Sequence, residues 1–178
     1  MIRFLILSLL IFTLTSCSTT QKTYSTGVID LGVVVSDIDK SLEFYQDVIG
    51  FQKVSQFTGK DKVVGDAGLL NYESVNVHVL SLNGDEQDTK LKLMQTKSKS
   101  VAQDQTYIGS TLGVSYITLF VNDLTPILEN LKKHNVKVMA KGPVDLAVVG
   151  FAPNYLACVR DPDGSIIEFV GPMKTVEK

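Results

Sequence analysis

Apolar and polar residues follow one another along the chain in a pattern that occurs twice. Residues 27–37 and residues 113–123 are each rich in β-forming residues and end in polar side chains. After each of these stretches apolar residues recur at helical spacing. Ser36 and Asn122 are the expected N-caps, because a short polar side chain before such a run suits a helix start. Each half is therefore predicted to open with a strand and a helix.

Three further strands are predicted in each half. They cover residues 52–57, 75–80 and 90–95 in the first half, and residues 137–140, 154–160 and 165–170 in the second. The order is strand, helix and three strands, twice, with residues 96–112 as the linker. In such a unit the helix covers one face of the sheet and leaves the other bare. Two units can therefore enclose a cleft between their bare faces, and the predicted fold class is α+β.

The last predicted strand follows the turn Asp161-Pro162-Asp163-Gly164 and carries one acid. Pro162 restricts φ at the first corner of the turn, and Gly164 tolerates the positive φ that most residues resist. Glu168 then stands among apolar residues on both faces of the strand. Since a buried acid needs a partner, a metal or a ligand, this strand indicates a site.

The repeat resembles the vicinal oxygen chelate superfamily, which includes glyoxalase I, extradiol dioxygenases, fosfomycin resistance proteins and bleomycin-binding proteins. The resemblance covers residues 27–172, and two pieces carry it. One is Val35-Ser36-Asp37 with the helix that follows it to Ile49-Gly50-Phe51, and the other is the Asp-Pro-Asp-Gly turn that leads to Glu168.

This resemblance implies two βαβββ modules, residues 27–95 and 113–172, that form a cupped mixed sheet around a central cleft. Residues 173–178 would be a C-terminal tail. Strand parity predicts which side chains line the cleft. They are Asp30, His78, Lys92, Met94, Tyr116, Phe120, Ile166 and Glu168.

In metal-using members of the superfamily, the ligands come from the first and last strands of each half and are usually His, Gln or Glu. The matching positions here hold Asp30, Lys92, Tyr116 and Glu168. Only Glu168 is a standard ligand, and Asp30 can offer oxygen to a hard cation. Protonated Lys92 has no free lone pair and repels a divalent cation. We therefore favour no cofactor and no metal; if a divalent metal is bound, Glu168 and Asp30 are its expected ligands.

The charges suggest instead that Asp30, Lys92 and Glu168 form a buried ion cluster where the metal would lie. Alternatives remain open for single residues. Asp30 can be a surface acid at a strand start, and Lys92 can extend to solvent. Tyr116 can be an aromatic wall, and His78 a structural histidine rather than an acid or base.

The N-terminus carries a separate signal. Residues 4–14 form an apolar run after Arg3 that is too short to cross a bilayer as a helix. Leu14-Thr15-Ser16-Cys17 resembles the bacterial lipoprotein signal, although an ordinary secretory signal with an incidental cysteine is the alternative. The resemblance implies a signal peptide over residues 1–16 and lipid attachment at Cys17.

Residues 17–26 consist of the lipidated cysteine and the polar segment that follows it, and they would then form a flexible tether. The expected location is the cell envelope, with the protein anchored to a membrane by its lipid. Ser18 follows the cysteine where an aspartate would often signal retention in the inner membrane. The outer membrane is therefore favoured if the host has two.

Composition narrows the classes of partner. The chain of 178 residues has a formal net charge of −2, no Trp and no basic stripe, which argues against nucleic acid. Once Cys17 is acylated, Cys158 has no cysteine partner, so an internal disulfide is excluded. We expect Cys158 to be a buried structural thiol rather than a nucleophile.

Three functions remain open at this stage. The first is a module that binds an unidentified small molecule in the cleft without a metal. The second is a metal-dependent lyase, isomerase or oxygenase in the envelope, and the third is metal-free acid–base catalysis by Glu168 or His78. No catalytic residue is assigned. A homodimer is also plausible, because family members pair their halves within one chain or between two chains.

Overall fold

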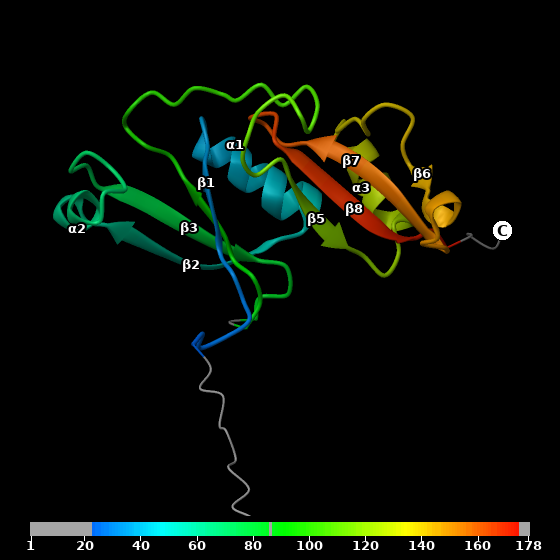
Figure 1. Ribbon diagram of the computed structural model, residues 1–178, viewed down its shortest axis with the longest axis horizontal. Helices are drawn as coiled ribbons and strands as arrows, with labels where there is room; N and C mark the ends of the chain where they lie inside the picture. The colour runs from blue at the N-terminus through cyan, green and yellow to red at the C-terminus, as the bar shows by residue number, and fades with distance from the viewer. Residues whose placement is uncertain (1–22, 86, 175–178) are drawn as a thin grey trace, which may run out of the picture.

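A computed structural model describes residues 23–85 and 87–174 and shows two similar halves (Figure 1). The first half contains β1 (Leu31–Val34), α1 (Ile38–Glu43), η1 (Phe44–Ile49), β2 (Gln52–Gly59), α2 (Asp61–Asp66), β3 (Val75–Ser81) and β4 (Leu91–Met94). The second contains β5 (Tyr116–Phe120), α3 (Thr125–Lys133), β6 (Val144–Asp145), η2 (Leu146–Val149), β7 (Asn154–Arg160) and β8 (Ile166–Pro172). Helix α1 continues directly into η1, whose turns are wider.

The strands form two four-stranded mixed sheets with the same topology. Their orders are β1-β4-β3-β2 and β5-β8-β7-β6. β1 is parallel to β4 and β5 is parallel to β8, whereas the remaining pairs are antiparallel. The predicted α+β fold with two βαβββ modules is therefore confirmed. β1 and β5 are both edge strands, and the linker crosses above them (Figure 1).

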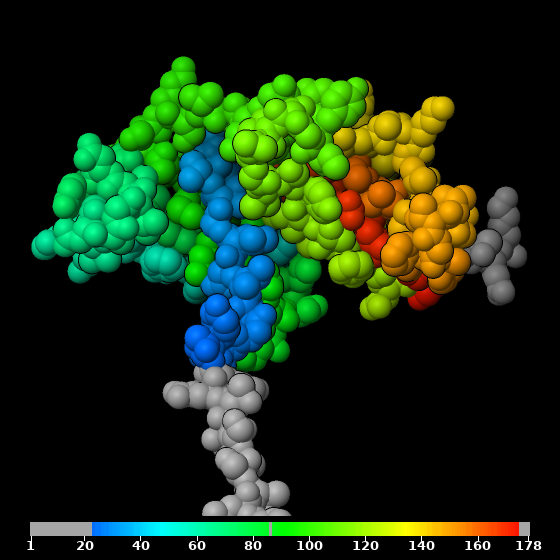
Figure 2. All heavy atoms as spheres, viewed as in Figure 1, coloured from blue at the N-terminus to red at the C-terminus, as the bar shows by residue number. Residues whose placement is uncertain are grey.

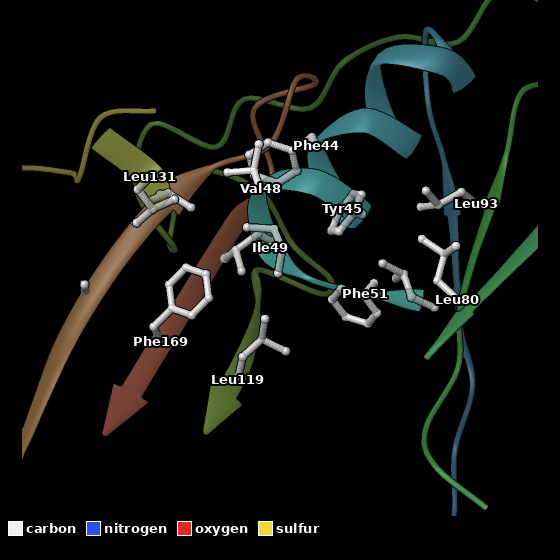
Figure 3. Close-up of a cluster of buried hydrophobic side chains, with 14 of the residues drawn as sticks. Phe44, Tyr45, Val48, Ile49, Phe51, Leu80, Leu93, Leu119, Leu131 and Phe169 are labelled. Carbon is white, nitrogen blue, oxygen red and sulfur yellow. The ribbon is translucent and has the colours of Figure 1, made fainter. Parts of the chain in front are cut away.

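One hydrophobic core joins the two halves. The α1–η1 segment lies between the sheets and contributes Tyr45 and Ile49 to this core (Figure 3). Leu93 of β4 packs on one side of the segment, and Leu119 of β5 and Phe169 of β8 pack on the other (Figure 3). Because a single helical segment is buried against both sheets, the two modules are packed as one unit.

Three local expectations need correction. The strand predicted at residues 137–140 is wrong: this segment bonds to β7 only from the Met139 N–H to the Cys158 carbonyl at 2.8 Å, and the ladder with β7 is formed by Val144 and Asp145. Ala140 has a φ of 51°, and this left-handed conformation interrupts an extended run. The expected N-caps are also displaced: Asp37 caps α1 through a bond to the Lys40 N–H, and α3 begins only at Thr125.

The N-terminal predictions lie outside the described residues. Cys17, the signal peptide at residues 1–16 and most of the tether at residues 17–26 all precede residue 23. Within residues 23–85 and 87–174, none of the helices has the length and apolar character needed to span a bilayer.

Candidate functional site

A pocket of about 510 Å³ lies between the two modules, where the edge strands β1 and β5 face each other. Its walls are mostly apolar and come from both modules. Tyr116 and Ile166 line it, as the sequence predicted for a cleft. The further lining side chains used below are Tyr45, Ala102, Gln103, Gln105 and Asp163. The volume falls within the range of about 300–1,000 Å³ typical of small-molecule sites.

Backbone groups add polarity to one wall of this pocket. The N–H groups of Leu31 and Val35 donate to the carbonyls of Lys90, just before β4, and Met94 of β4 at 2.8 and 2.9 Å. The backbone groups of the intervening residues Gly32 and Val34 therefore point away from β4, and both residues line the pocket. A free sheet edge offers unpaired N–H and C=O groups. The pocket thus combines apolar side chains with backbone hydrogen-bonding groups.

The linker covers the pocket and is held by one arginine. The Arg160 guanidinium donates to the backbone oxygens of Gln105 at 2.7 Å and Thr106 at 3.1 Å. The same side chain donates to the Gly164 carbonyl at 2.7 Å. In the space-filling view the linker, drawn in green, lies beside β1, drawn in blue (Figure 2). Arg160 therefore fixes the backbone of the linker against the turn between β7 and β8.

That turn also connects the two modules at the border of the pocket. The Tyr45 hydroxyl donates to Asp161 Oδ2 at 2.9 Å, and both residues are buried. Asp161 Oδ1 accepts from the backbone N–H groups of Asp163 and Ser165 at 3.0 and 2.7 Å. Asp163 Oδ2 in turn accepts from the Ser36 N–H at 3.0 Å. We call these contacts of Asp161 and Asp163 with the first module the turn latch.

Asp30 and Lys92 form an ion pair with 2.7 Å between Lys92 Nζ and Asp30 Oδ2. Their side chains are 32% and 37% exposed for Lys92 and Asp30, respectively, so water screens this pair. The hydrogen bond from Lys92 lowers the pKa of Asp30 below its usual value, and the Lys90 N–H assists. The sequence interpretation in which these two side chains meet is confirmed, but the pair is not deeply buried.

Glu168 belongs to the other sheet. Its Oε1 accepts from the Thr118 hydroxyl at 3.1 Å, across the β5–β8 pair. Among the described residues no ion pair joins Lys92 to Glu168. The predicted three-member cluster is therefore wrong, because Lys92 pairs with Asp30 alone and Glu168 is bonded to Thr118 within its own sheet. Cys158 pairs with Glu168 in the ladder and is half-buried rather than buried as predicted. Burial and then the Glu168 charge raise the pKa of its thiol, which disfavours a nucleophilic thiolate.

The prediction that His78 lies on the cleft side with Lys92 is wrong. His78 pairs with Leu93 in the β3–β4 ladder, so it points to the helix side of the sheet, whereas Val79 pairs with Lys92. His78 lines a separate cavity of about 380 Å³ together with Ile38. Burial, and next the charge of Lys53, lower the pKa of His78, and its Nδ1 is enclosed without a hydrogen-bond partner.

Two other predicted cleft residues do not line the pocket between the modules. Met94 packs against a second hydrophobic cluster formed by Val64 of α2 with Val75, Val77 and Val79 of β3. Phe120 is 81% exposed at the end of β5. The pocket therefore includes two of the eight predicted cleft residues, Tyr116 and Ile166.

Sequence reasoning missed the contribution of the linker and of the turn latch. Gln105 and Ala102 belong to a segment without periodicity, which gave no structural signal. Tyr45 belongs to the hydrophobic core, and its hydroxyl contacts a residue 116 positions away in the sequence. The turn residue Asp163 was recognised only for its conformation. The only signal in the sequence was that this turn directly precedes the strand that carries Glu168.

The side chains at the family's metal positions do not fit a divalent cation in this arrangement. Lys92 already holds Asp30, and Glu168 is bonded to Thr118 in the other sheet. In the part of the chain that the structure describes, no group of three or more His, Cys, Asp or Glu residues is arranged to hold a metal. A metal site normally needs three or four such ligands.

Comparison with known proteins identifies the family and supports the fold. The pattern of the Glyoxalase/Bleomycin resistance protein/Dioxygenase superfamily matches residues 27–169. A glyoxalase family protein from Bacillus cereus superposes with a TM-score of 0.71 at 14% identity, covering 88% of this chain and 100% of that one. A comparison with curated proteins gives no match.

Two glyoxalase I structures are also similar. The Leishmania major enzyme has a TM-score of 0.57 at 21% identity, covering 83% of this chain and 87% of that one. A mutant of the Zea mays enzyme has a TM-score of 0.58 at 19% identity, covering 84% of this chain but 46% of that one. Such identities indicate a shared fold and leave the chemistry to the site itself.

Proposed function

Because the chain belongs to the glyoxalase/bleomycin resistance/dioxygenase superfamily, we propose that it binds a small molecule between its two modules, without the family metal and anchored to a membrane. The observation that carries the proposal is the pocket of about 510 Å³ between β1 and β5. Its walls are mainly apolar, and the linker held by Arg160 covers it. A partly covered apolar pocket with a few polar groups is the usual form of a small-molecule site.

The charges at the metal positions support a metal-free binding module over a metal-dependent enzyme. The ammonium of Lys92 neutralises Asp30, and a divalent cation near them would have to overcome its repulsion. The two glyoxalase I structures share the fold with this chain at no more than 21% identity. A shared fold at such identity is no evidence that this chain performs their chemistry. Acid–base catalysis by His78 also loses support, because its side chain lies on the helix side of the sheet.

The membrane anchor is proposed from the sequence alone. The run Leu14-Thr15-Ser16-Cys17 supports lipid attachment at Cys17, and several acyl chains at about 0.8 kcal/mol per buried methylene would hold the protein durably. Such a protein would present its pocket within the cell envelope, so that its ligand would be an envelope or environmental compound. A homodimer stays a prediction.

A metal-loading experiment tests the metal-free proposal. The full chain is purified in detergent and incubated with Zn²⁺, Mn²⁺ or Ni²⁺. We expect it to retain less than about 0.1 ion per chain after desalting, because the Lys92 ammonium already pairs with Asp30, one of the two expected ligands. Elemental analysis by mass spectrometry measures the content. The matched variant is Glu168→Gln. Stoichiometric metal in the wild type that is lost in this variant would contradict the proposal and favour the enzyme.

A further inference from the structure

One side-chain oxygen at the pocket is enclosed without a hydrogen-bond partner among the described residues. Gln105 lines the pocket, and its Oε1 is enclosed without a partner. Leaving an acceptor unpaired away from water costs free energy, and native proteins rarely tolerate it without a reason. The amide of Gln105 is therefore a group that a ligand can satisfy.

The backbone of Gln105 is held by a hydrogen bond, whereas its side-chain Oε1 has no partner among the described residues. Arg160 donates to the Gln105 carbonyl at 2.7 Å, so the position of the residue over the pocket is set by the second module. The terminal amide of glutamine turns easily about its last side-chain bond. Such a turn exchanges the positions of Oε1 and Nε2, so that Oε1 can face a ligand in the pocket without a movement of the linker.

The remaining lining groups restrict the charge of the ligand. Among the described residues Asp163 is the only carboxylate that lines the pocket, and no lysine, arginine or histidine of that part of the chain lines it. The neighbouring Arg160 guanidinium is already directed at three backbone carbonyls. Its positive charge also acts on Asp104, whose pKa is lowered by the Thr106 N–H and hydroxyl and, to a smaller extent, by Arg160. An anionic ligand would therefore meet a carboxylate and no free cation.

We propose that Gln105 is the specificity-determining residue of this pocket, and that it selects an uncharged, largely apolar ligand carrying a hydroxyl or amide N–H for Gln105 Oε1. This inference rests on the proposed function, because it assumes that the pocket between β1 and β5 binds a small molecule. It adds the chemical class of that molecule and the side chain that recognises it. We expect carboxylates and phosphates to bind more weakly, because they would meet the Asp163 carboxylate.

Three naphthalene probes of similar shape test this assignment. They are 2-naphthalenemethanol, which can donate a hydrogen bond, its methyl ether, which cannot, and 2-naphthoate, which is anionic. Binding to the full chain is measured by equilibrium dialysis against empty micelles at the same detergent concentration. One net hydrogen bond corresponds to a preference for the alcohol over the ether of about 2- to 10-fold. We expect naphthoate to bind more weakly than either.

Two variants of the linker assign that preference to one residue. Gln105→Leu should bind the alcohol and the ether equally, whereas Gln103→Leu, a glutamine that also lines the pocket, should retain the preference. Circular dichroism checks that both variants fold, which we expect because Gln105 Oε1 has no hydrogen-bond partner among the described residues and Gln103 is exposed.

The outcomes separate the two levels of the proposal. Failure of the wild type to bind any of the three probes contradicts the proposed function itself. Equal binding of alcohol and ether by the wild type, or a preference that persists in Gln105→Leu, overturns the role of Gln105 and leaves the binding function standing. Naphthoate binding as tight as that of the alcohol overturns the expected discrimination against anions.

Discussion

Replacing Asp161 with alanine is expected to lower the free energy of unfolding by about 2–4 kcal/mol, because one buried and two partly buried hydrogen-bond donors lose their acceptor. These donors are the Tyr45 hydroxyl and the N–H groups of Asp163 and Ser165. The side chain that accepts them is 6% exposed, so water cannot readily replace it. Urea unfolding followed by circular dichroism measures the loss.

Asp145→Ala is the matched control for this prediction. Asp145 is an exposed aspartate that accepts one backbone N–H, from Ala147 at 2.8 Å. Its removal should cost about 0.5–1 kcal/mol, because solvent can take over the donor. Equal losses in the two variants would contradict the conclusion that the turn latch joins the modules.

The pH dependence of the same residue gives an independent check. Burial raises the pKa of Asp161 above its usual value, although the bonds from Tyr45 and the backbone act in the opposite direction. The folded state therefore binds the Asp161 proton more tightly than the unfolded state does. Ionisation of this carboxyl lowers the free energy of unfolding, and protonation raises it again. As the pH falls from 7 toward 4, the wild type should gain stability relative to Asp161→Asn, which cannot titrate.

The second large effect is expected for Phe169→Ala, at about 3–5 kcal/mol of lost stability. Phe169 is 1% exposed and lies where the α1–η1 segment meets the second sheet, close to Ile49 and Leu119 (Figure 3). The substitution leaves a cavity in the core that joins the two modules. Thermal and urea unfolding should show one transition shifted to lower stability.

Phe120→Ala provides the comparison, since it removes the same side chain from a neighbouring strand. Phe120 is 81% exposed, so its loss should change stability by no more than about 0.5 kcal/mol. A large loss on Phe120→Ala would mean that this exposed face is covered by another molecule in solution. A small loss on Phe169→Ala would contradict the shared core.

The repeat and the order of elements were predictable because apolar periodicity reports local structure directly. The helix-facing residues Leu91 and Leu93 of β4, for example, are buried as their alternation indicated. The orientation of β3 could not be read in the same way. Val75, Val77 and Val79 are buried on the side away from α1, because α2 and Met94 cover that side as well. Alternation therefore gave the wrong direction for His78.

The pocket was less predictable than the fold, because it depends on contacts between distant segments. Tyr116 and Ile166 were found by parity along their own strands. Gln105 was not, since its position depends on Arg160, which is 55 residues away in the sequence. The predicted charge cluster failed for a related reason: matching positions in the two halves need not meet when each sheet satisfies its own polar groups.

The central claim is that a small molecule occupies the pocket between the modules, and a substitution that fills the pocket tests it most directly. Ala102 lines the pocket from the exposed linker, whereas Ala67 is an exposed alanine outside it. Binding of 2-naphthalenemethanol to the full chain is measured by equilibrium dialysis for the wild type, Ala102→Trp and Ala67→Trp. Our account predicts at least about tenfold weaker binding for Ala102→Trp alone, equivalent to about 1.4 kcal/mol. Equal binding by all three proteins would place the probe elsewhere and contradict it.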